Sequence, residues 1–177
     1  MTRWTSLLLL ALAVACSSDD GGGGSKPKPE PTLTFEADAT PPGVALTLRQ
    51  KELTQDRLVL ELVGGSVQDL YGVAFRLSYD STALTFTQLS AGTAWGGGAP
   101  VALGVAKTPG LLVGTVSAKG QAKGVSGKEA VLAVVTFALN ERKPSALDFV
   151  VQRSALLNTS GKPIEGVGFA GGDLVLK

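Results

Sequence analysis

The sequence lacks histidine altogether, has a single cysteine, Cys16, and draws only 6% of its residues from aromatics. Without histidine, the commonest general base and metal ligand is missing. With one cysteine, the chain cannot form an internal disulfide, so packing alone must hold its folded part. The acidic residues are scattered and form no nucleophile–base pair. We therefore expect no catalytic residue, no cofactor and no metal site.

Charge of either sign is also scarce. The chain has 16 basic and 15 acidic residues, which gives a formal net charge of +1. No basic stripe or tail stands out along the sequence. Nucleic-acid binding depends on such a basic footprint, so nucleic acid is not expected as a partner.

One apolar run opens the chain. Arg3 supplies a positive charge, and Leu7 to Ala15 then gives nine apolar residues in succession. A membrane-spanning helix needs ~20 such residues, so this run is too short to cross a bilayer. A charged start, a short apolar core and small residues at the end are typical of a secretory signal peptide. We expect residues 1–15 to be that leader.

The leader ends on a motif that predicts a lipid anchor. Leu12-Ala13-Val14-Ala15-Cys16 resembles the bacterial lipobox, and the only thiol of the chain stands where diacylglycerol is attached through a thioether. The prediction is an exported lipoprotein held on a membrane through Cys16. The alternative is an ordinary signal peptide followed by an incidental cysteine. Ser17 replaces the aspartate that commonly marks inner-membrane retention, which favours the outer membrane or cell surface.

A linker is predicted from residue 16 to residue 31. Ser17 to Ser25 contains no apolar residue and four consecutive glycines, so it cannot offset the entropy of ordering. Lys26 to Pro31 alternates proline with charge, which favours a stiffer extended spacer. Residues 32–177 then form one folded domain, long enough for a single core.

The hydrophobic pattern of that domain has a period of two. Leu58, Leu60 and Leu62 share one side of an expected strand. Over residues 70–79, one side of the expected strand carries Tyr71, Val73, Phe75, Leu77 and Tyr79, and the other carries Leu70, Gly72, Ala74, Arg76 and Ser78. Further strand-like runs are expected at 84–89, 101–106, 111–118, 130–139, 146–151 and 173–176. Many short strands separated by glycine- and proline-containing turns indicate an all-β sandwich or barrel.

Three stretches carry a resemblance to a known family. Residues 69–86, reading DLYGVAFRLSYDSTALTF, are similar to the best-matched region of cohesin domains, in which a strand ends on Tyr-Asp before the chain re-enters the core. Residues 127–137 and 146–164 resemble two later strands and an N-x-x-G-x-P-I turn of the same family, in the same order. The resemblance implies a nine-stranded jelly-roll β-sandwich, a fold also related to carbohydrate-binding modules.

For function, the resemblance implies binding of another protein through a sheet face, as well-studied cohesins bind dockerin modules. The outward positions that are polar in dockerin-binding cohesins fall here on Gly72 and Ala74. An acidic position on the partner strand falls near Ser117-Ala118-Lys119. Neither position matches, so no binding residue is carried over, and a typical dockerin is not expected to bind tightly.

Direct binding of a polysaccharide is the alternative. Sugar-binding sandwiches present planar aromatic rings, and Trp95 has glycines beside it that could leave its ring accessible. The competing interpretation is a loop tryptophan folded over the sandwich edge, which is favoured because tryptophan is usually largely buried. Trp95 is therefore a weak sugar-contact candidate.

Overall fold

The computed structural model describes residues 31–96 and 98–177. The predicted leader, Cys16 and all but the last residue of the predicted linker lie outside these residues.

The described part contains eleven strands and two single-turn 3-10 helices. The strands are β1 Leu33–Ala37, β2 Ala45–Leu53, β3 Arg57–Tyr79, β4 Leu84–Ala91, β5 Val101–Thr108, β6 Leu111–Ser117, β7 Val125–Leu139, β8 Ser145–Phe149, β9 Ala155–Asn158, β10 Gly168–Ala170 and β11 Gly172–Leu176. The 3-10 helices are η1 Thr93–Trp95 and η2 Val151–Arg153. In these two ranges, no helix is long and apolar enough to cross a membrane.

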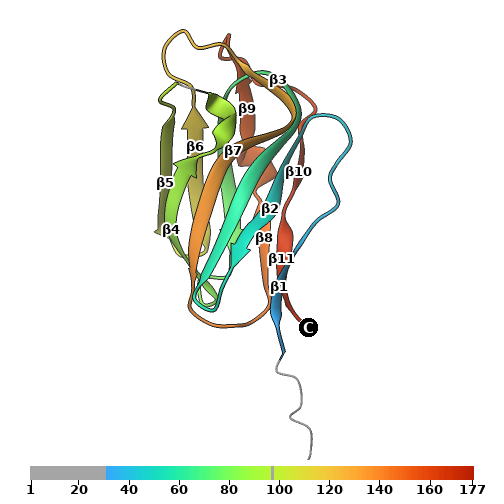
Figure 1. Ribbon diagram of the computed structural model, residues 1–177, viewed down its shortest axis with the longest axis vertical. Helices are drawn as coiled ribbons and strands as arrows, with labels where there is room; N and C mark the ends of the chain where they lie inside the picture. Colours follow the sequence, from blue (N-terminus) through green and yellow to red (C-terminus); the bar gives the residue numbers. More distant parts are fainter. Residues whose placement is uncertain (1–30, 97) are drawn as a thin grey trace, which may run out of the picture. The chain divides into compact units, whose positions relative to one another are not determined.

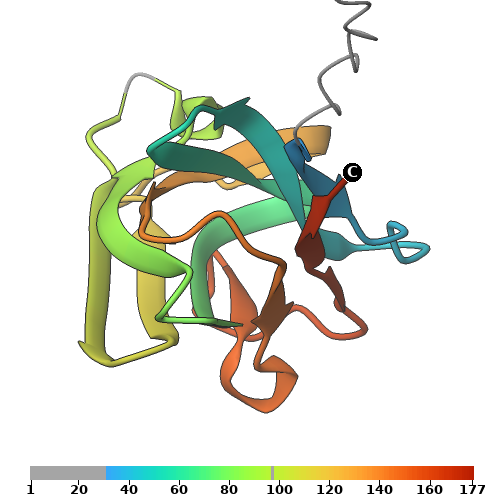
Figure 2. The ribbon, with the colours of Figure 1, turned by 90° about the horizontal axis from the view of Figure 1, so that it is seen from below.

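The long strand β3 belongs to both layers of a sandwich (Figures 1 and 2). Residues 57–67 of β3 pair with β2 and β7, and β10 and β4 extend this first layer. Residues 70–79 pair with β6 on one side and with β8 and β9 on the other, and β5, β11 and β1 complete the second layer. All strand pairs are antiparallel except β2 with β10. The ends of the domain meet, since β1 pairs with β11 (Figure 1).

The passage of β3 between layers is fixed by its backbone and by hydrogen bonds. Ser66 and Asp69 have φ values of 50° and 52°, a left-handed conformation that residues other than glycine rarely adopt. The backbone N–H of Asp69 donates to Ser126 Oγ at 3.0 Å, and Thr159 Oγ1 donates to Asp69 Oδ2 at 2.7 Å. The two strands expected at 57–63 and 70–79 are therefore one strand, bent where it changes sheets.

The core confirms the predicted strand phase. Leu58, Leu60 and Leu62 are fully buried, and Phe75 and Leu77 lie in the same apolar cluster between the sheets. Two further predicted core residues are also buried, Val73 and Tyr79. Tyr71 differs from the expectation, because it is only half-buried and its hydroxyl donates to the carbonyl of Gly120 at 2.9 Å. The aromatic residues pack edge to face, with the Tyr79 and Phe137 ring centres 5.1 Å apart.

The all-β sandwich is confirmed, whereas the expected count of nine strands is not. The period-two runs of the sequence do not include β1, β2, β9 or β10. β9 and β10 are four and three residues long, too short to show a period. β2 carries Arg49-Gln50-Lys51 in its middle, and its register with β3 shifts between Gln50 and Glu52, which breaks the alternation.

Candidate functional site: an exposed apolar sheet face

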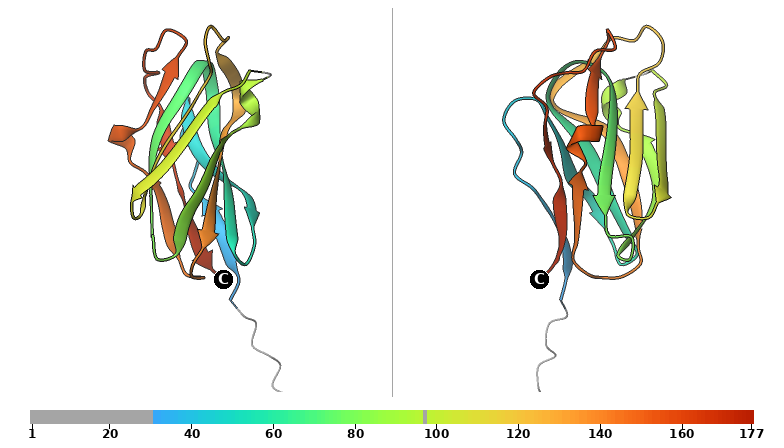
Figure 3. Two further views of the ribbon diagram at one scale, coloured as in Figure 1. Left: turned by 90° about the vertical axis from the view of Figure 1, so that its left-hand side faces the viewer. Right: turned by 180° about the vertical axis from the view of Figure 1, so that it is seen from behind.

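The outer surface of the second layer exposes large apolar side chains. Four of them lie on two paired strands: Val101 at 42% exposure, Leu103 at 61% and Val105 at 45% on β5, and Val113 at 42% on β6. We call the outer surface formed by β5, β6, residues 70–79 of β3, and β9 the open face; Figure 3 (right) looks onto these strands. Contiguous apolar surface of this kind is uncommon on soluble proteins and marks interaction sites.

The strand register arranges the open face in rows. Facing residues of paired strands point to the same side of a sheet. The rows that follow across β5, β6 and β3 are Val101–Ser117–Gly72, Leu103–Thr115–Ala74 and Val105–Val113–Arg76. Beyond β3, Leu157 and Ala155 of β9 face Gly72 and Ala74. The centre of the face is therefore apolar or small, and it presents no charged side chain until the third row.

Packing inside the sandwich explains why the large side chains of β5 and β6 point outward. A Cβ added at Gly104 would lie 2.7 Å from Phe86 Cζ and 2.7 Å from Leu89 Cβ, both on β4. A Cβ added at Gly114 would lie 2.3 Å from Phe75 Cζ. The interior therefore has no room for a side chain at Gly104 or Gly114, and the large residues that alternate with these glycines, Leu103, Val105 and Val113, face solvent.

Two cations border the apolar rows. Arg76 of β3 and Arg153 at the end of η2 line one hollow with Ala74, Leu103 and Val113. Neither guanidinium forms an ion pair with any residue that the structure describes. A ligand group in this hollow can therefore contact both apolar side chains and the two arginines.

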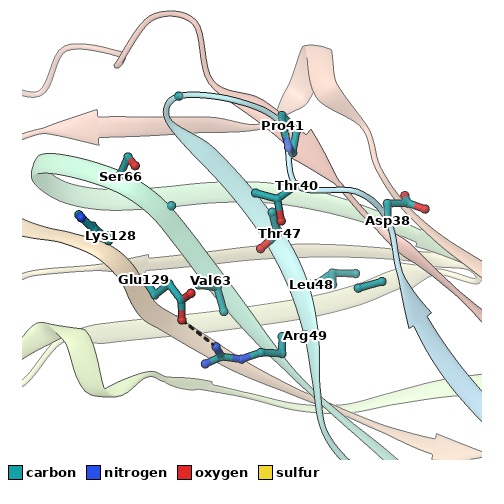
Figure 4. Close-up of a pocket in the computed structure, with 13 residues that line it drawn as sticks. Asp38, Thr40, Pro41, Thr47, Leu48, Arg49, Val63, Ser66, Lys128 and Glu129 are labelled. Carbon is teal, nitrogen blue, oxygen red and sulfur yellow. Dashed lines mark hydrogen bonds and ion pairs between the residues drawn. The ribbon is translucent and has the colours of Figure 1, made fainter.

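The outer surface of the first layer is different. Arg49 of β2 forms an ion pair with Glu61 at 2.8 Å and with Glu129 at 3.3 Å, as Figure 4 shows for Glu129. The hydrogen bonds that the Arg49 guanidinium donates to Glu61 raise the pKa of Arg49. A second hollow lies here, next to Arg49 and Lys128 and below the loop that holds Pro41 (Figure 4). Two of its charged residues, Arg49 and Glu129, are paired with each other, so these two offer little to a ligand.

Trp95, the sugar-contact candidate, lies in the core cluster. Its side chain is 9% exposed, and its Nε1 donates to the carbonyl of Leu132 at 2.7 Å. A ring in this position offers little area for stacking on a pyranose. The geometry favours the interpretation of Trp95 as a loop tryptophan that covers the sandwich edge.

The other predicted positions divide into two groups. Gly72 and Ala74 do lie on the open face, as their alternation predicted. Leu70, expected on the same outward side, is instead fully buried, and the register of β3 with β9 shifts between Leu70 and Gly72. Cys16 lies outside the described residues. Within residues 31–96 and 98–177, no three acidic, histidine or cysteine residues are grouped so that they could hold a metal ion.

Sequence reasoning did not single out Val101, Leu103, Val105 and Val113 as surface residues. An apolar alternation on a strand usually marks the buried side, so it gave no reason to place these residues in solvent. A signal was nevertheless present. Ala102 and Gly104 alternate with the large residues of β5, and Gly114 follows Val113 on β6. Such size alternation, clearest on β5, indicates that the small side faces a crowded interior.

Comparison with known proteins identifies the fold. No protein-family model matches the chain, and no curated protein matches its sequence. Solved structures do match it. The second type II cohesin module of the adaptor ScaA scaffoldin of Acetivibrio cellulolyticus superposes with a TM-score of 0.58 at 17% identity, covering 82% of this chain and 96% of that one. The sixth cohesin of scaffoldin B from the same organism, in complex with a Cel5 dockerin, gives 0.56 at 14% identity, covering 72% and 96%.

A third match, CaCohA2 from Clostridium acetobutylicum, has a TM-score of 0.59 at 16% identity, covering 73% of this chain and 88% of that one. The fold is cohesin-like. This confirms the resemblance found in the sequence. Identities of 14–17% establish the architecture of the cohesin-like domain and no more than the architecture.

Proposed function

We propose that this chain is a non-catalytic, lipid-anchored envelope protein whose cohesin-like domain binds another protein through the open face. The observation that carries the proposal is the exposure of Val101, Leu103, Val105 and Val113 on the outer side of two paired strands. Burying such side chains against a partner gains about 25 cal/mol for each Å² removed from water. The sequence offers no histidine and no reactive thiol beyond Cys16, which also favours binding over catalysis.

The structural neighbours support a protein partner, because the matching cohesin of scaffoldin B was solved in complex with a dockerin. The contacts in the present chain must be of another kind. Gly72 and Ala74 carry no polar side-chain atom, so the middle of the open face can make no side-chain hydrogen bonds from these positions. We infer that apolar contact dominates docking and that the partner is not a typical dockerin.

A capture experiment with matched variants tests the proposed docking surface. The full chain, kept in mild detergent, serves as bait for envelope extract of the organism that makes it. Leu103→Asp places a charge in the centre of the open face, and Leu176→Asp makes the same change at a residue of β11 that is 39% exposed. The wild type and Leu176→Asp should retain the same protein, and Leu103→Asp should lose it. Equal retention by the two variants, or no retained protein with wild type, would contradict the proposal.

The anchor has a separate test. Cys16→Ala removes the thiol to which the lipid would be attached, so the protein should move from the membrane to the soluble fraction. Cell fractionation followed by detergent-free washing measures the change. A variant that stays with the membrane through the washes would refute the lipid anchor, whatever the outcome for the open face.

A further inference from the structure

The two arginines of the open face point to the chemistry of the partner. Arg76 belongs to the third row, where it faces Val113 across the β3–β6 pair. Arg153 comes from η2, far along the chain, and lines the same hollow as Arg76 and Leu103. A partner side chain that enters this hollow contacts apolar atoms. The residues next to it in the partner then reach the guanidinium groups of Arg76 and Arg153.

Five other basic residues that the structure describes form ion pairs. Ion pairs join Arg49 to Glu61, Arg57 to Glu52, and Lys143 to Asp80, and Lys51 and Lys177 also contact carboxylates. Over the described part of the chain, Arg76 and Arg153 have no such contact. A guanidinium group presents a planar set of donors that matches a carboxylate in a bidentate manner. Both arginines are therefore available to acidic groups of a partner.

The charge of the open face disfavours a second copy of the chain as that partner. Arg76, Arg153 and the exposed Lys107 at the end of β5 are basic. Of the acids, Asp148 of β8 lies next to this surface, where it faces Ser78 of β3. A symmetric dimer would bring the same surface of two copies together, and so would oppose predominantly like charges. An acidic partner has no such penalty.

We propose that the open face selects a protein segment in which an apolar side chain is flanked by carboxylates, and that Arg76 and Arg153 make this selection. The apolar side chain enters the hollow beside Leu103 and Ala74, and the carboxylates accept hydrogen bonds from the two guanidinium groups. This inference rests on the proposed function, because it names the chemistry of the partner for the same surface.

Phage-displayed random peptides, selected on the full chain in mild detergent, provide the probe. Enriched peptides are synthesised with a fluorescent label, and their affinities are measured by anisotropy. The test variant is Arg76→Gln with Arg153→Gln. The control, Lys128→Gln with Arg142→Gln, removes the same charge from two exposed positions on β7 and the β7–β8 loop. Leu103→Asp identifies the peptides that bind the open face, and circular dichroism verifies that each variant is folded.

Peptides that depend on Leu103 should combine an apolar residue with neighbouring aspartate or glutamate. The variant with Arg76→Gln and Arg153→Gln should bind these peptides about tenfold more weakly than wild type, which corresponds to about 1.4 kcal/mol. The control pair should change the affinity far less, and added salt should weaken wild-type binding.

The outcomes separate the two proposals. The selection by Arg76 and Arg153 is overturned if the peptides that need Leu103 for binding are neutral or basic. It is also overturned if these peptides bind the arginine variant as tightly as wild type. Either result leaves docking on the open face intact. If no enriched peptide depends on Leu103, the proposed function fails as well. If the full chain dimerises in analytical ultracentrifugation and Leu103→Asp abolishes the dimer, a second copy is the occupant and the proposed acidic partner is wrong.

Discussion

The two layers of the sandwich turn different surfaces outward. On the first layer, Val59 and Val63 alternate with the inward leucines of β3 and so lie on the outer side, yet they are only 8% and 5% exposed. Ion-paired side chains such as Arg49 and Glu61 occupy that surface. On the second layer, Leu103 is 61% exposed.

The contrast shows that the open face is not a general consequence of building a small sandwich. Long charged side chains can cover apolar atoms with their methylene groups, and the ion-paired Arg49 and Glu61 share the outer surface of the first layer with Val59 and Val63. The central rows of the second layer carry glycine, alanine, serine and threonine beside the large apolar residues, and none of these can cover a neighbour. The apolar side chains of β5 and β6 are therefore left available for a partner.

The largest expected effect concerns the two sides of β3 itself. Phe75 is 1% exposed and packs against Phe149 with ring centres 6.4 Å apart. Phe75→Ala should lower the free energy of unfolding by about 3–5 kcal/mol, because it leaves a cavity between the layers. Arg76→Ala, one residue later and on the outer side, should cost under about 1 kcal/mol. Urea unfolding measures both values, and equal losses would be incompatible with the strand phase described here.

A second comparison sets the open face against cohesins that bind dockerins. Gly72 and Ala74 leave two positions without polar side chains, and each polar group of a dockerin left unpaired costs about 1–3 kcal/mol. Two such losses weaken binding by about 30-fold or more, at about 1.4 kcal/mol for each factor of ten. Calorimetry with calcium-loaded dockerins of several types should therefore detect no tight binding. Nanomolar affinity for any of them would show that other residues of the face recognise dockerins.

The charged surface of the first layer should contribute little to stability. Arg49 is about half exposed, at 46%, and Glu61 is 17% exposed. A double-mutant cycle with Arg49→Ala and Glu61→Ala should give a coupling of about 0.2–1 kcal/mol that falls as salt is added. A coupling that is large and independent of salt would mean that the pair holds the first layer together, and that the two surfaces differ in more than coverage.

The smallest effect is expected in acid, at the end of the sandwich. Asp80 accepts hydrogen bonds from the hydroxyl and backbone N–H of Thr82 and pairs with Lys143, and these contacts, that of the Thr82 hydroxyl first, hold the pKa of Asp80 well below its ordinary value. A carboxyl whose pKa is lowered on folding stabilises the fold above its unfolded pKa of about 3.9 and loses that contribution as the pH falls further.

Thermal unfolding of Asp80→Asn at a series of pH values measures this contribution. The variant should be less stable than wild type at neutral pH, and the difference should shrink below about pH 4. A difference that stays constant down to strong acid would show that the ionised carboxylate is not what stabilises the turn. The result would also measure how much a paired charge contributes to the stability of this protein, in contrast to the unpaired Arg76 and Arg153.

Much of the fold could be predicted from the sequence, and the physical reasons are visible in single strands. The alternation from Val73 to Tyr79 fixed which side of β3 is buried, because large and small or polar residues alternate there without interruption. The strand ends at Tyr79, directly before Asp80, where the resemblance places its end, and Asp80 Oδ1 accepts the N–H of Thr82 at 2.8 Å. The continuity of β3 was not predictable, because Ser66 and Asp69 adopt a left-handed conformation that their residue types do not announce.

The candidate site was the harder part to predict. Alternation gives two sides of a strand but does not say which side a crowded interior can accept. On β5, that choice depends on Phe86 and Leu89 of β4, which occupy the space next to Gly104. Such a contact between residues of opposite layers follows from the fold and not from local sequence. The same holds for Arg153, which only the fold brings to the hollow beside Arg76.

The central claim is that the open face is covered by a partner protein in the cell. Site-specific photo-crosslinking tests it most directly, with a photoreactive amino acid placed at position 103 or, as the control, at position 176 of the full chain in the organism that makes it. After irradiation of intact cells, position 103 should give a discrete adduct of higher mass with another protein, and position 176 should give none. The account would be contradicted if position 103 gave no adduct, or if both positions gave the same one.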